Sequence, residues 1–180
     1  VDSDEDPYSI KKGFWYAHFL WMFDKKKPIN YSIIPDLTKN KLLIFQNKYY
    51  GWLVLITSLA PILFLGFFLN DFVGGFMLAF LARLFFSHHF TWFINSLAHT
   101  WGRKPYNKNI SAVDNEIMAI LTFGEGYHNY HHAFAYDYRN GIRWYHFDPG
   151  KWLIWTCYKF GLAKNLTRVN KWSIKKKKLL

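Results

Sequence analysis

Hydrophobic and polar residues occur in long blocks along this chain of 180 residues. No charged residue occurs from Tyr49 to Asn70, and 22 residues are enough to cross about 30 Å of hydrocarbon as a helix. Pro61 lies inside this stretch, where membrane helices tolerate a proline with a kink. A short turn at Asn70 and Asp71 leads into a second apolar run. The pattern predicts a transmembrane hairpin of two helices, over residues 49–70 and 72–95.

The blocks on either side of the hairpin are mixed in character. Residues 1–48 are polar and basic apart from an aromatic run at 13–23, which is too short to span a bilayer. We expect that run to lie in the interface plane or to pack in a core. Residues 96–170 form a predicted cytosolic region, and residues 171–180 a basic tail that we expect to be solvated and disordered. The fold class is therefore all-α and integral to the membrane, one domain over 1–180 with a transmembrane helical hairpin and a cytosolic helical cap.

The net charge of +11 favours an anionic partner. No nucleic-acid motif is present and the basic residues flank the apolar spans, so we predict membrane lipids and a phosphate-bearing substrate, and no nucleic acid. A single cysteine, Cys157, excludes an internal disulfide and disfavours a cysteine metal site. Lysines precede the first span, Arg103 and Lys104 follow the second, and the hairpin tip carries Asp71 without Lys or Arg. The positive-inside rule then places both ends in the cytoplasm, at the inner membrane of a bacterium or the endoplasmic reticulum of a eukaryote.

The densest chemical motif is the nonapeptide GEGYHNYHH, residues 124–132. Its histidines, His128, His131 and His132, are spaced i, i+3, i+4 and so share one face of a helix. Neutral imidazole is the commonest metal-binding side chain. A solvated polar helix face is the alternative. A metal site held by histidines without thiolates admits iron, zinc, copper or nickel, and the spacing does not choose among them.

The second apolar run also carries polar residues that are costly in a membrane. His88, Asn95 and His99 lie at i, i+7 and i+11, and their helical stripe passes Thr91 and Trp92. We predict that this stripe faces a site instead of lipid. His99 alone would be read as a buried histidine with its hydrogen bonds satisfied, but together with the nonapeptide it is a candidate metal ligand.

Three other histidines are weaker candidates. His88 and His89 are adjacent, and hydrogen bonding at a helix interface is the favoured interpretation for both. His18 lies in the aromatic run, and we interpret it as structural or adjacent to the substrate, not as a metal ligand.

These motifs resemble a known family. GEGYHNYHH is similar to the third histidine box of the membrane-bound acyl-CoA desaturases, the stearoyl-CoA Δ9-desaturase family. Four further segments resemble that family in the right order, over residues 2–168. They are the Asp6-Pro7 segment with Gly13, Phe14 and His18, the NSxxHxxG segment at 95–102, the DYRNG segment at 137–141 with RWY at 143–145, and the DPxKW segment at 148–152, where Gly150 replaces the usual threonine.

The resemblance implies fatty acyl-CoA desaturation, in which O2 and two electrons introduce a cis double bond at a centre of two iron ions. It implies His99, His128, His131 and His132 as metal ligands and Asn95 as a contact through a water, so the cap would carry a diiron half-site. Zinc could replace the iron in a purified protein. The implied partners are fatty acyl-CoA or another acyl carrier, and an electron donor such as cytochrome b5 or a ferredoxin.

The same resemblance suggests substrate contacts. Lys25 and Lys26, and also Lys11 and Lys12, align with basic pairs expected to contact the coenzyme A phosphates. Positive-inside charge and contact with lipid headgroups explain these lysines equally well. Thr91 and Trp92 are candidate walls of an acyl tunnel, although core packing explains any single aromatic.

The family's HxxxxH and HxxHH boxes are missing from these residues. We therefore expect the chain to be the carboxyl-terminal part of a longer protein, and the isolated segment neither to bind two irons tightly nor to desaturate a substrate. A histidine-box hydroxylase or monooxygenase is the alternative enzyme. A non-catalytic membrane remnant or structural zinc binder is the alternative outside catalysis. A basic lipid- or nucleic-acid-binding protein would explain the charge but not the histidines.

Overall fold

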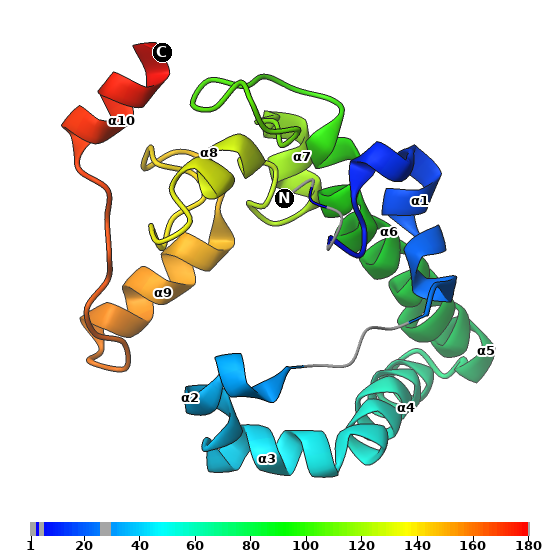
Figure 1. The fold of residues 1–180 in the computed structure, drawn as a ribbon. Helices are drawn as coiled ribbons and strands as arrows, with labels where there is room; N and C mark the ends of the chain where they lie inside the picture. The colour runs from blue at the N-terminus through cyan, green and yellow to red at the C-terminus, as the bar shows by residue number, and fades with distance from the viewer. Residues whose placement is uncertain (1–2, 4–5, 26–29, 180) are drawn as a thin grey trace. The chain divides into compact units, whose positions relative to one another are not determined.

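The computed structural model describes residues 3, 6–25 and 30–179. In this part of the chain every regular element is helical, apart from isolated β-bridges at Asp114. The residues divide into two compact units, which we call the histidine unit (Val1–Asp24 with His89–Leu180) and the hairpin unit (Lys25–His88). Figure 1 shows the helices of both. The predicted all-α fold class is confirmed.

The hairpin unit is built around one long apolar helix. Asn40 caps a preceding helix by accepting from the Leu42 amide, and Asp71 caps the return helix by accepting from the Gly74 amide. Such caps satisfy amides that a helix start leaves unpaired. The elements are η3 (Tyr31–Ile33), α2 (Pro35–Thr38), α3 (Lys41–Lys48), α4 (Tyr50–Phe68), α5 (Phe72–Phe76) and the π-helical turn η4 (Met77–Ala82), which runs on into α6 (Arg83–Asn95).

Two helical runs have the length and composition of membrane spans. They are Tyr50–Phe68 and Phe72–His99, and only 6% and 11% of their apolar windows are buried within the protein. An apolar helix that other protein does not cover suits a lipid environment. Both predicted helices are therefore present, and the run that contains the second includes a separate 3-10 turn at Leu97–His99 after the α-helix ends at Asn95.

Glycine lets the two arms of the hairpin touch. A Cβ atom on Gly75 would lie 2.8 Å from the Gly66 amide nitrogen and 3.0 Å from the Ile62 carbonyl oxygen. Only a residue without a side chain allows this backbone approach, which is a common way for membrane helices to pack. The turn before α5 is therefore fixed by Asp71 at its cap and by Gly75 at its crossing.

Replacing Gly75 by alanine should destabilise the hairpin by about 1–3 kcal/mol, because the added methyl meets backbone atoms that cannot rotate away. Thermal unfolding of the full-length protein in detergent measures the change. Gly51→Ala is the matched control, since no atom lies within 4 Å of its added methyl. Equal melting temperatures for the two variants would contradict the close crossing.

The histidine unit consists of short helices joined by ordered loops. The aromatic run at 13–23 forms two of these short helices, and part of it packs in a core, since Ala17 is 0% and His18 2% exposed. The elements are η1 (Ile10–Lys12), α1 (Phe14–His18), η2 (Leu20–Phe23), the end of α6, η5 (Leu97–His99), α7 (Glu116–Leu121), α8 (His128–Ala133), α9 (Pro149–Lys159) and α10 (Lys171–Leu179).

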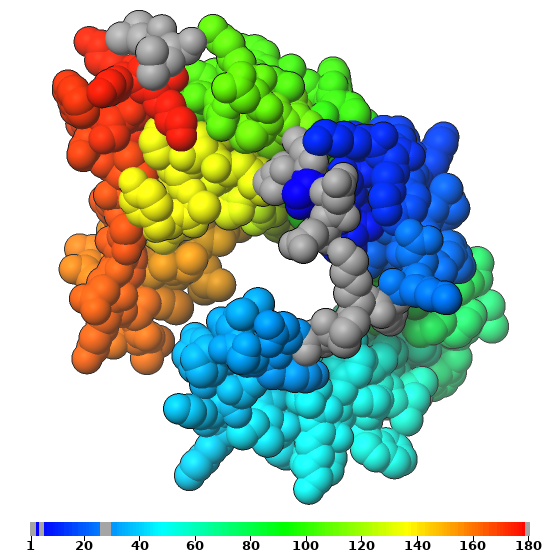
Figure 2. Space-filling model, viewed as in Figure 1, coloured from blue at the N-terminus to red at the C-terminus, as the bar shows by residue number. Residues whose placement is uncertain are grey.

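The expectation of a disordered basic tail is wrong for Lys171–Leu179, which form α10. Asn170 accepts from the Ser173 amide at 2.7 Å, and Lys177 Nζ donates to the Ala133 carbonyl at 3.0 Å. Ile174 packs against the cluster of Tyr130, Phe134 and Val169. Figure 2 shows α10 in red against the yellow surface of residues near α8. Lysine is a good helix former, so a single apolar anchor and a cap suffice to order this segment.

Candidate metal centre

Three histidines from two segments converge in the histidine unit. His99 stands at the end of η5, and His128 and His132 lie one turn apart on α8. Their candidate ligand nitrogens all lie within 4.8 Å of one another. The Nε2 atoms of His128 and His132 are 3.0 Å apart, and the His99 and His128 rings have centroids 4.8 Å apart.

A break in the helix brings His99 into this cluster. The helix α6 ends at Asn95, Ser96 lies outside it, and a 3-10 turn carries Leu97–His99. The predicted continuous helical stripe is therefore interrupted before His99. His88 does not belong to the cluster, and its Nδ1 contacts the Leu84 carbonyl of its own helix at 2.7 Å.

A cavity of about 450 Å³ opens beside the three histidines. His131 lines it, with its ring 5.9 Å from that of His128, but its nitrogens lie outside the three-residue group. Asn95 also lines it, and its water-mediated contact with a metal stays a prediction. Among the residues that the structure describes, the wall consists of Ser3, Asp6, Tyr8, Ile94, Asn95, His99, Glu125, His128, His131 and His132.

The residues present fit a metal ion. Two nitrogens bound to one ion at about 2.1 Å lie roughly 3.0–3.3 Å apart, close to the His128–His132 separation. Nδ1 of His128 is buried and has no hydrogen-bond partner among the described residues. Burial, reinforced by the neighbouring rings of His99 and His132, holds the pKa of His128 well below its usual value. The ring is therefore neutral, which is the form that binds metals.

A hydrogen bond to the ring nitrogen that faces away from the cluster holds the His99 ring in place. The Ser111 hydroxyl contacts Nδ1 of His99 at 2.6 Å, so Nε2 is the candidate ligand atom of this ring. Such a contact on the other ring nitrogen is what orients metal-binding histidines in proteins. Because Ser111 lies on the loop between η5 and α7, the placement of that loop decides the orientation of His99.

Asn129 fixes this loop to α8. Its side chain is completely buried, its Oδ1 accepts from the Tyr106 and Asn107 amides at 2.9 and 3.1 Å, and its Nδ2 donates to the Asn107 and Ala112 carbonyls at 2.8 and 2.9 Å. All four hydrogen-bonding positions of the amide are thus used. The residue next to His128 therefore ties the helix of the nonapeptide to the loop that carries Ser111.

Asp114 supports the start of α8. Its Oδ1 accepts from the Tyr130 amide at 3.0 Å, which satisfies one of the unpaired amides of the first helical turn. Burial raises the pKa of Asp114 to about 6, although hydrogen bonds from backbone amides and the charge of Arg103 oppose the rise. The folded protein thus holds a proton on this carboxyl more tightly than the unfolded chain does.

Stability should depend on pH through Asp114. A raised pKa contributes stability that is present below about pH 4 and is lost as the pH rises through about 6. We expect Asp114→Asn to stabilise the full-length protein at pH 7 by on the order of 2 kcal/mol, and to have little effect near pH 4. Thermal unfolding at both pH values measures this. A variant destabilised equally at both would show that the ionised carboxylate is the stabilising form.

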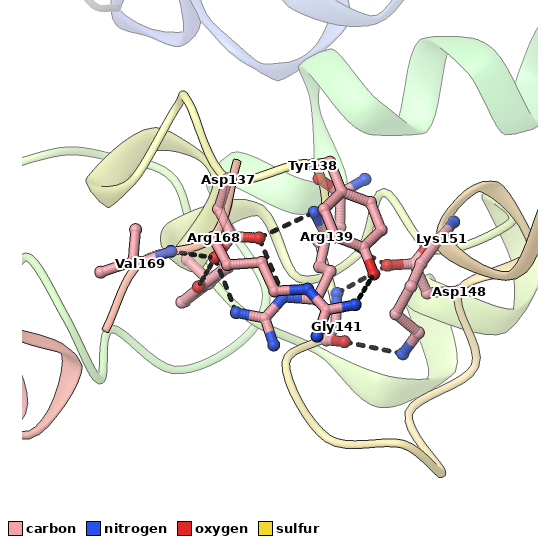
Figure 3. A network of polar contacts seen from close by, with 10 residues as sticks. Asp137, Tyr138, Arg139, Gly141, Asp148, Lys151, Arg168 and Val169 are labelled. Carbon is pink, nitrogen blue, oxygen red and sulfur yellow. Dashed lines mark hydrogen bonds and ion pairs between the residues drawn. The ribbon is translucent and has the colours of Figure 1, made fainter. Parts of the chain in front are cut away.

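A second carboxylate network holds the segment that follows α8. Asp148 Oδ2 accepts from the Asn140 and Gly141 amides at 2.9 and 2.8 Å, and Asn140 Nδ2 donates to Glu125 Oε1 at 2.9 Å. Glu125 lines the cavity, so Asn140 connects the DYRNG segment to the cavity wall. Figure 3 shows the buried Lys151 ammonium turned toward the Gly141 carbonyl, which it contacts at 2.7 Å.

Asp137 joins α8 to the segment that precedes α10 (Figure 3). It accepts from the Tyr130 hydroxyl at 2.8 Å, from Arg139 at 2.8 and 2.9 Å, and from the Val169 amide at 2.9 Å. Burial works against its ionisation, but the hydrogen bonds from Arg139 and Val169 hold its pKa below the usual value. Both oxygens of the buried Asp137 carboxylate thus accept hydrogen bonds, which is a condition under which a buried charge persists.

Steric contacts explain why the nonapeptide has glycine at positions 124 and 126. Gly124 has φ +107°, and a Cβ there would lie 3.0 Å from Asp148. A Cβ on Gly126 would lie 2.1 Å from the Ala119 amide nitrogen. The chain must therefore pass close to α7 and to the start of α9 before it enters α8.

Two of the predicted substrate lysines, Lys11 and Lys12, lie in the histidine unit and are not among the residues that line the cavity. Lys11 and Lys12 are exposed on η1, and Lys12 Nζ contacts the Tyr16 hydroxyl at 3.0 Å. Lys25 is exposed in the hairpin unit, and Lys26 lies outside the described residues. Their proposed contacts with coenzyme A stay predictions.

The aromatic end of α6 packs around His18. His18 contacts the Ser96 hydroxyl through Nδ1 at 2.9 Å and His89 Nδ1 through Nε2 at 3.0 Å, and the Trp92 ring lies 5.6 Å away. Both nitrogens of His18 thus make contacts within the protein, in keeping with a structural role, and His89 makes the interhelical contact expected of it. Thr91 and Trp92 do not line the cavity, and their assignment to a tunnel wall stays a prediction.

Sequence reasoning missed Ser111, Asp114 and the hydrogen-bonding role of Asn140. Ser111 lies in a polar loop without a motif, so no pattern marks it. Asn140 belongs to the DYRNG segment, which the sequence analysis singled out as a motif. Only the fold shows that the Asn140 side chain donates to Glu125.

Comparison with known proteins gives a consistent result. The fatty acid desaturase family model matches residues 1–167. The chain is 44% identical over 169 residues to a probable acyl-CoA desaturase of Schizosaccharomyces pombe and 42% identical over 172 residues to acyl-CoA desaturase 1 of Saccharomyces cerevisiae. These matches cover 92% and 93% of the chain but only 35% and 34% of the relatives. Stearoyl-CoA desaturase 5 of Homo sapiens is 32% identical over 184 residues, which is 98% of this chain and 56% of the relative.

Proposed function

Because this chain belongs to the fatty acid desaturase family, we propose that the protein introduces a cis double bond into a saturated fatty acyl-CoA. The observation that carries the proposal is the convergence of His99, His128 and His132 beside a cavity. The chain spans about a third of the length of its two fungal relatives, so the activity proposed is that of the full-length protein.

The proposed metal is iron, with His99, His128 and His132 as ligands and His131 and Asn95 as further contacts from the cavity wall. When bound, an iron pair would supply the activation of O2 that removes two hydrogens from adjacent methylenes, with two electrons and two protons entering and two waters leaving. The absence of thiolate from the site fits a metal that must meet a strong oxidant, since cysteine sulfur is itself oxidised. Zinc would fit the same nitrogens in a purified sample.

Residues of this chain hold the three proposed metal-binding histidines in position. Ser111 orients His99, and Asn129 and Asp114 fix α8, so the three ligands are positioned before any metal arrives. The Glu125 carboxylate lies on the cavity wall, three residues before His128, and accepts a hydrogen bond from Asn140. Such preorganisation lowers the barrier by fixing geometry in advance.

The substrate and the electron donor are proposed on the resemblance to the relatives. The acyl-CoA phosphates would meet Lys11, Lys12, Lys25 and Lys26, and the electrons would come from a carrier such as cytochrome b5 or a ferredoxin. The positive charges beside the two candidate spans support a topology with both ends in the cytoplasm. We propose that the cavity faces the cytoplasm, at the endoplasmic reticulum of a eukaryote or the inner membrane of a bacterium.

Product analysis tests the proposal. The full-length protein, loaded with iron, is given a saturated acyl-CoA, O2 and a reduced electron carrier, and the acyl products are separated by mass spectrometry. An acyl chain lighter by two hydrogens supports desaturation. A hydroxylated acyl chain would identify a monooxygenase, and an unchanged chain with full metal content would identify a non-catalytic metal protein.

A further inference from the structure

The helix α9 exposes far more apolar surface than it buries. Its first turn is fixed to the body by the Asp148 cap and by the buried Lys151, and from there it extends away from α8 (Figure 1). Beyond that turn the large side chains are open to solvent. We call the following six the α9 apolar surface: Trp152 (42% exposed), Leu153 (65%), Trp155 (46%), Tyr158 (48%), Phe160 (77%) and Leu162 (79%).

This surface is bordered by positive charge. Residues 149–180 contain nine Lys and Arg and no Asp or Glu. Lys159 Nζ lies 5.2 Å above the Trp155 ring. Lys164 and Arg168 line a cavity of about 670 Å³ together with Trp155 and Tyr158. Cationic groups and aromatic rings are thus presented side by side, next to the two most exposed side chains of the α9 apolar surface, Phe160 and Leu162.

This combination identifies the class of partner. Exposed apolar patches of this extent are uncommon on a protein surface that contacts only water. Trp and Tyr favour the boundary between hydrocarbon and water, and Lys and Arg beside them favour anionic headgroups. A protein partner with an acidic face would complement the charge, but it would not call for the most exposed residues to be Phe160 and Leu162 at a loop tip beside a cationic cavity.

We propose that the α9 apolar surface docks on an anionic phospholipid membrane. Phe160 and Leu162 enter the acyl region, Trp155 and Tyr158 lie at the headgroup level, and Lys159, Lys164 and Arg168 meet lipid phosphates. This gives the histidine unit a membrane contact of its own, in addition to the two candidate spans. The contact concerns only membrane binding, so it stands or falls independently of the reaction proposed above.

Depth-resolved fluorescence tests the proposal on the full-length protein. The protein is placed in nanodiscs of phosphatidylcholine with a minority of phosphatidylserine, after its other cysteines, including Cys157, have been replaced. An environment-sensitive dye is attached at Phe160→Cys or Leu162→Cys, and at Ile117→Cys on α7, which is 56% exposed, as the control. Nitroxide-labelled lipids should quench the dye at 160 and 162 and leave the control bright, whereas aqueous iodide should do the reverse.

Three results would overturn the proposal. Iodide quenching at 160 and 162 equal to that at 117 would show a surface open to water. Protection from both quenchers would show that protein, either the upstream part of the chain or a partner, covers the surface. A charge-reversed pair, Lys159→Glu with Lys164→Glu, should reduce lipid quenching at 162 by about half or more, and the pair Lys104→Glu with Lys108→Glu should not. Equal quenching for both pairs would refute the anionic-lipid contact.

Discussion

Replacing His128 by alanine in the full-length protein should abolish acyl desaturation and lower the bound metal. His128 is the most buried of the three converging histidines, at 6% exposed, and burial keeps its ring neutral. Loss of a residue that only orients a metal ligand costs 10–100-fold in affinity or activity, so loss of the ligand itself should cost at least about 100-fold. Turnover of a saturated acyl-CoA and metal content by mass spectrometry measure the two effects.

His88→Ala is the matched control for this experiment. His88 contacts a carbonyl of its own helix and stands outside the histidine cluster, so its loss should leave metal content and turnover near those of the parent. His128→Gln, measured together with size-exclusion behaviour, separates loss of the ligand from loss of the fold. A well-folded His128 variant with the parent's metal content would remove His128 from the site and, with it, the main support for the proposed function.

The sequence was sufficient for the features that depend on local periodicity. Two apolar runs, the first without a charged residue, predicted two helices, and spacing i, i+4 placed His128 and His132 on one face of α8. Both kinds of inference use only the repeat of the helix and the cost of charge in an apolar setting. The family resemblance rested on motif order and was confirmed by the match over residues 1–167.

What the sequence could not supply depends on contacts between distant segments. The break after Asn95 that brings His99 to α8 has no proline to mark it. At this point the Ser96 hydroxyl donates to the Trp92 carbonyl, a contact that often bends a helix. The Ser111 contact and the Asn140 contact join residues twelve and fifteen positions apart. The expected disorder of the tail is wrong because Ile174 packs on the Tyr130 cluster and Lys177 donates to the Ala133 carbonyl, contacts that composition does not indicate.

Asn129→Leu should be the most destabilising single change around the site. Leucine has nearly the same shape but cannot pair with the Tyr106 and Asn107 amides or the Asn107 and Ala112 carbonyls, all of which face a completely buried side chain. Each buried group left unpaired costs about 1–3 kcal/mol, so the loss should reach about 4 kcal/mol, a large part of the stability of a typical domain. Thermal unfolding of the full-length protein and its metal content are the measurements.

The loss of metal in this variant should follow from the loop and not from a ligand. When the loop at 105–112 separates from α8, Ser111 no longer holds His99, so metal affinity should fall even in molecules that remain folded. Asn109→Leu is the control in the same loop, because Asn109 is exposed and its replacement should change stability by no more than about 0.5 kcal/mol. If both variants unfold at the parent's temperature, the buried amide does not fasten the loop, and the orientation of His99 must come from the metal instead of preceding it.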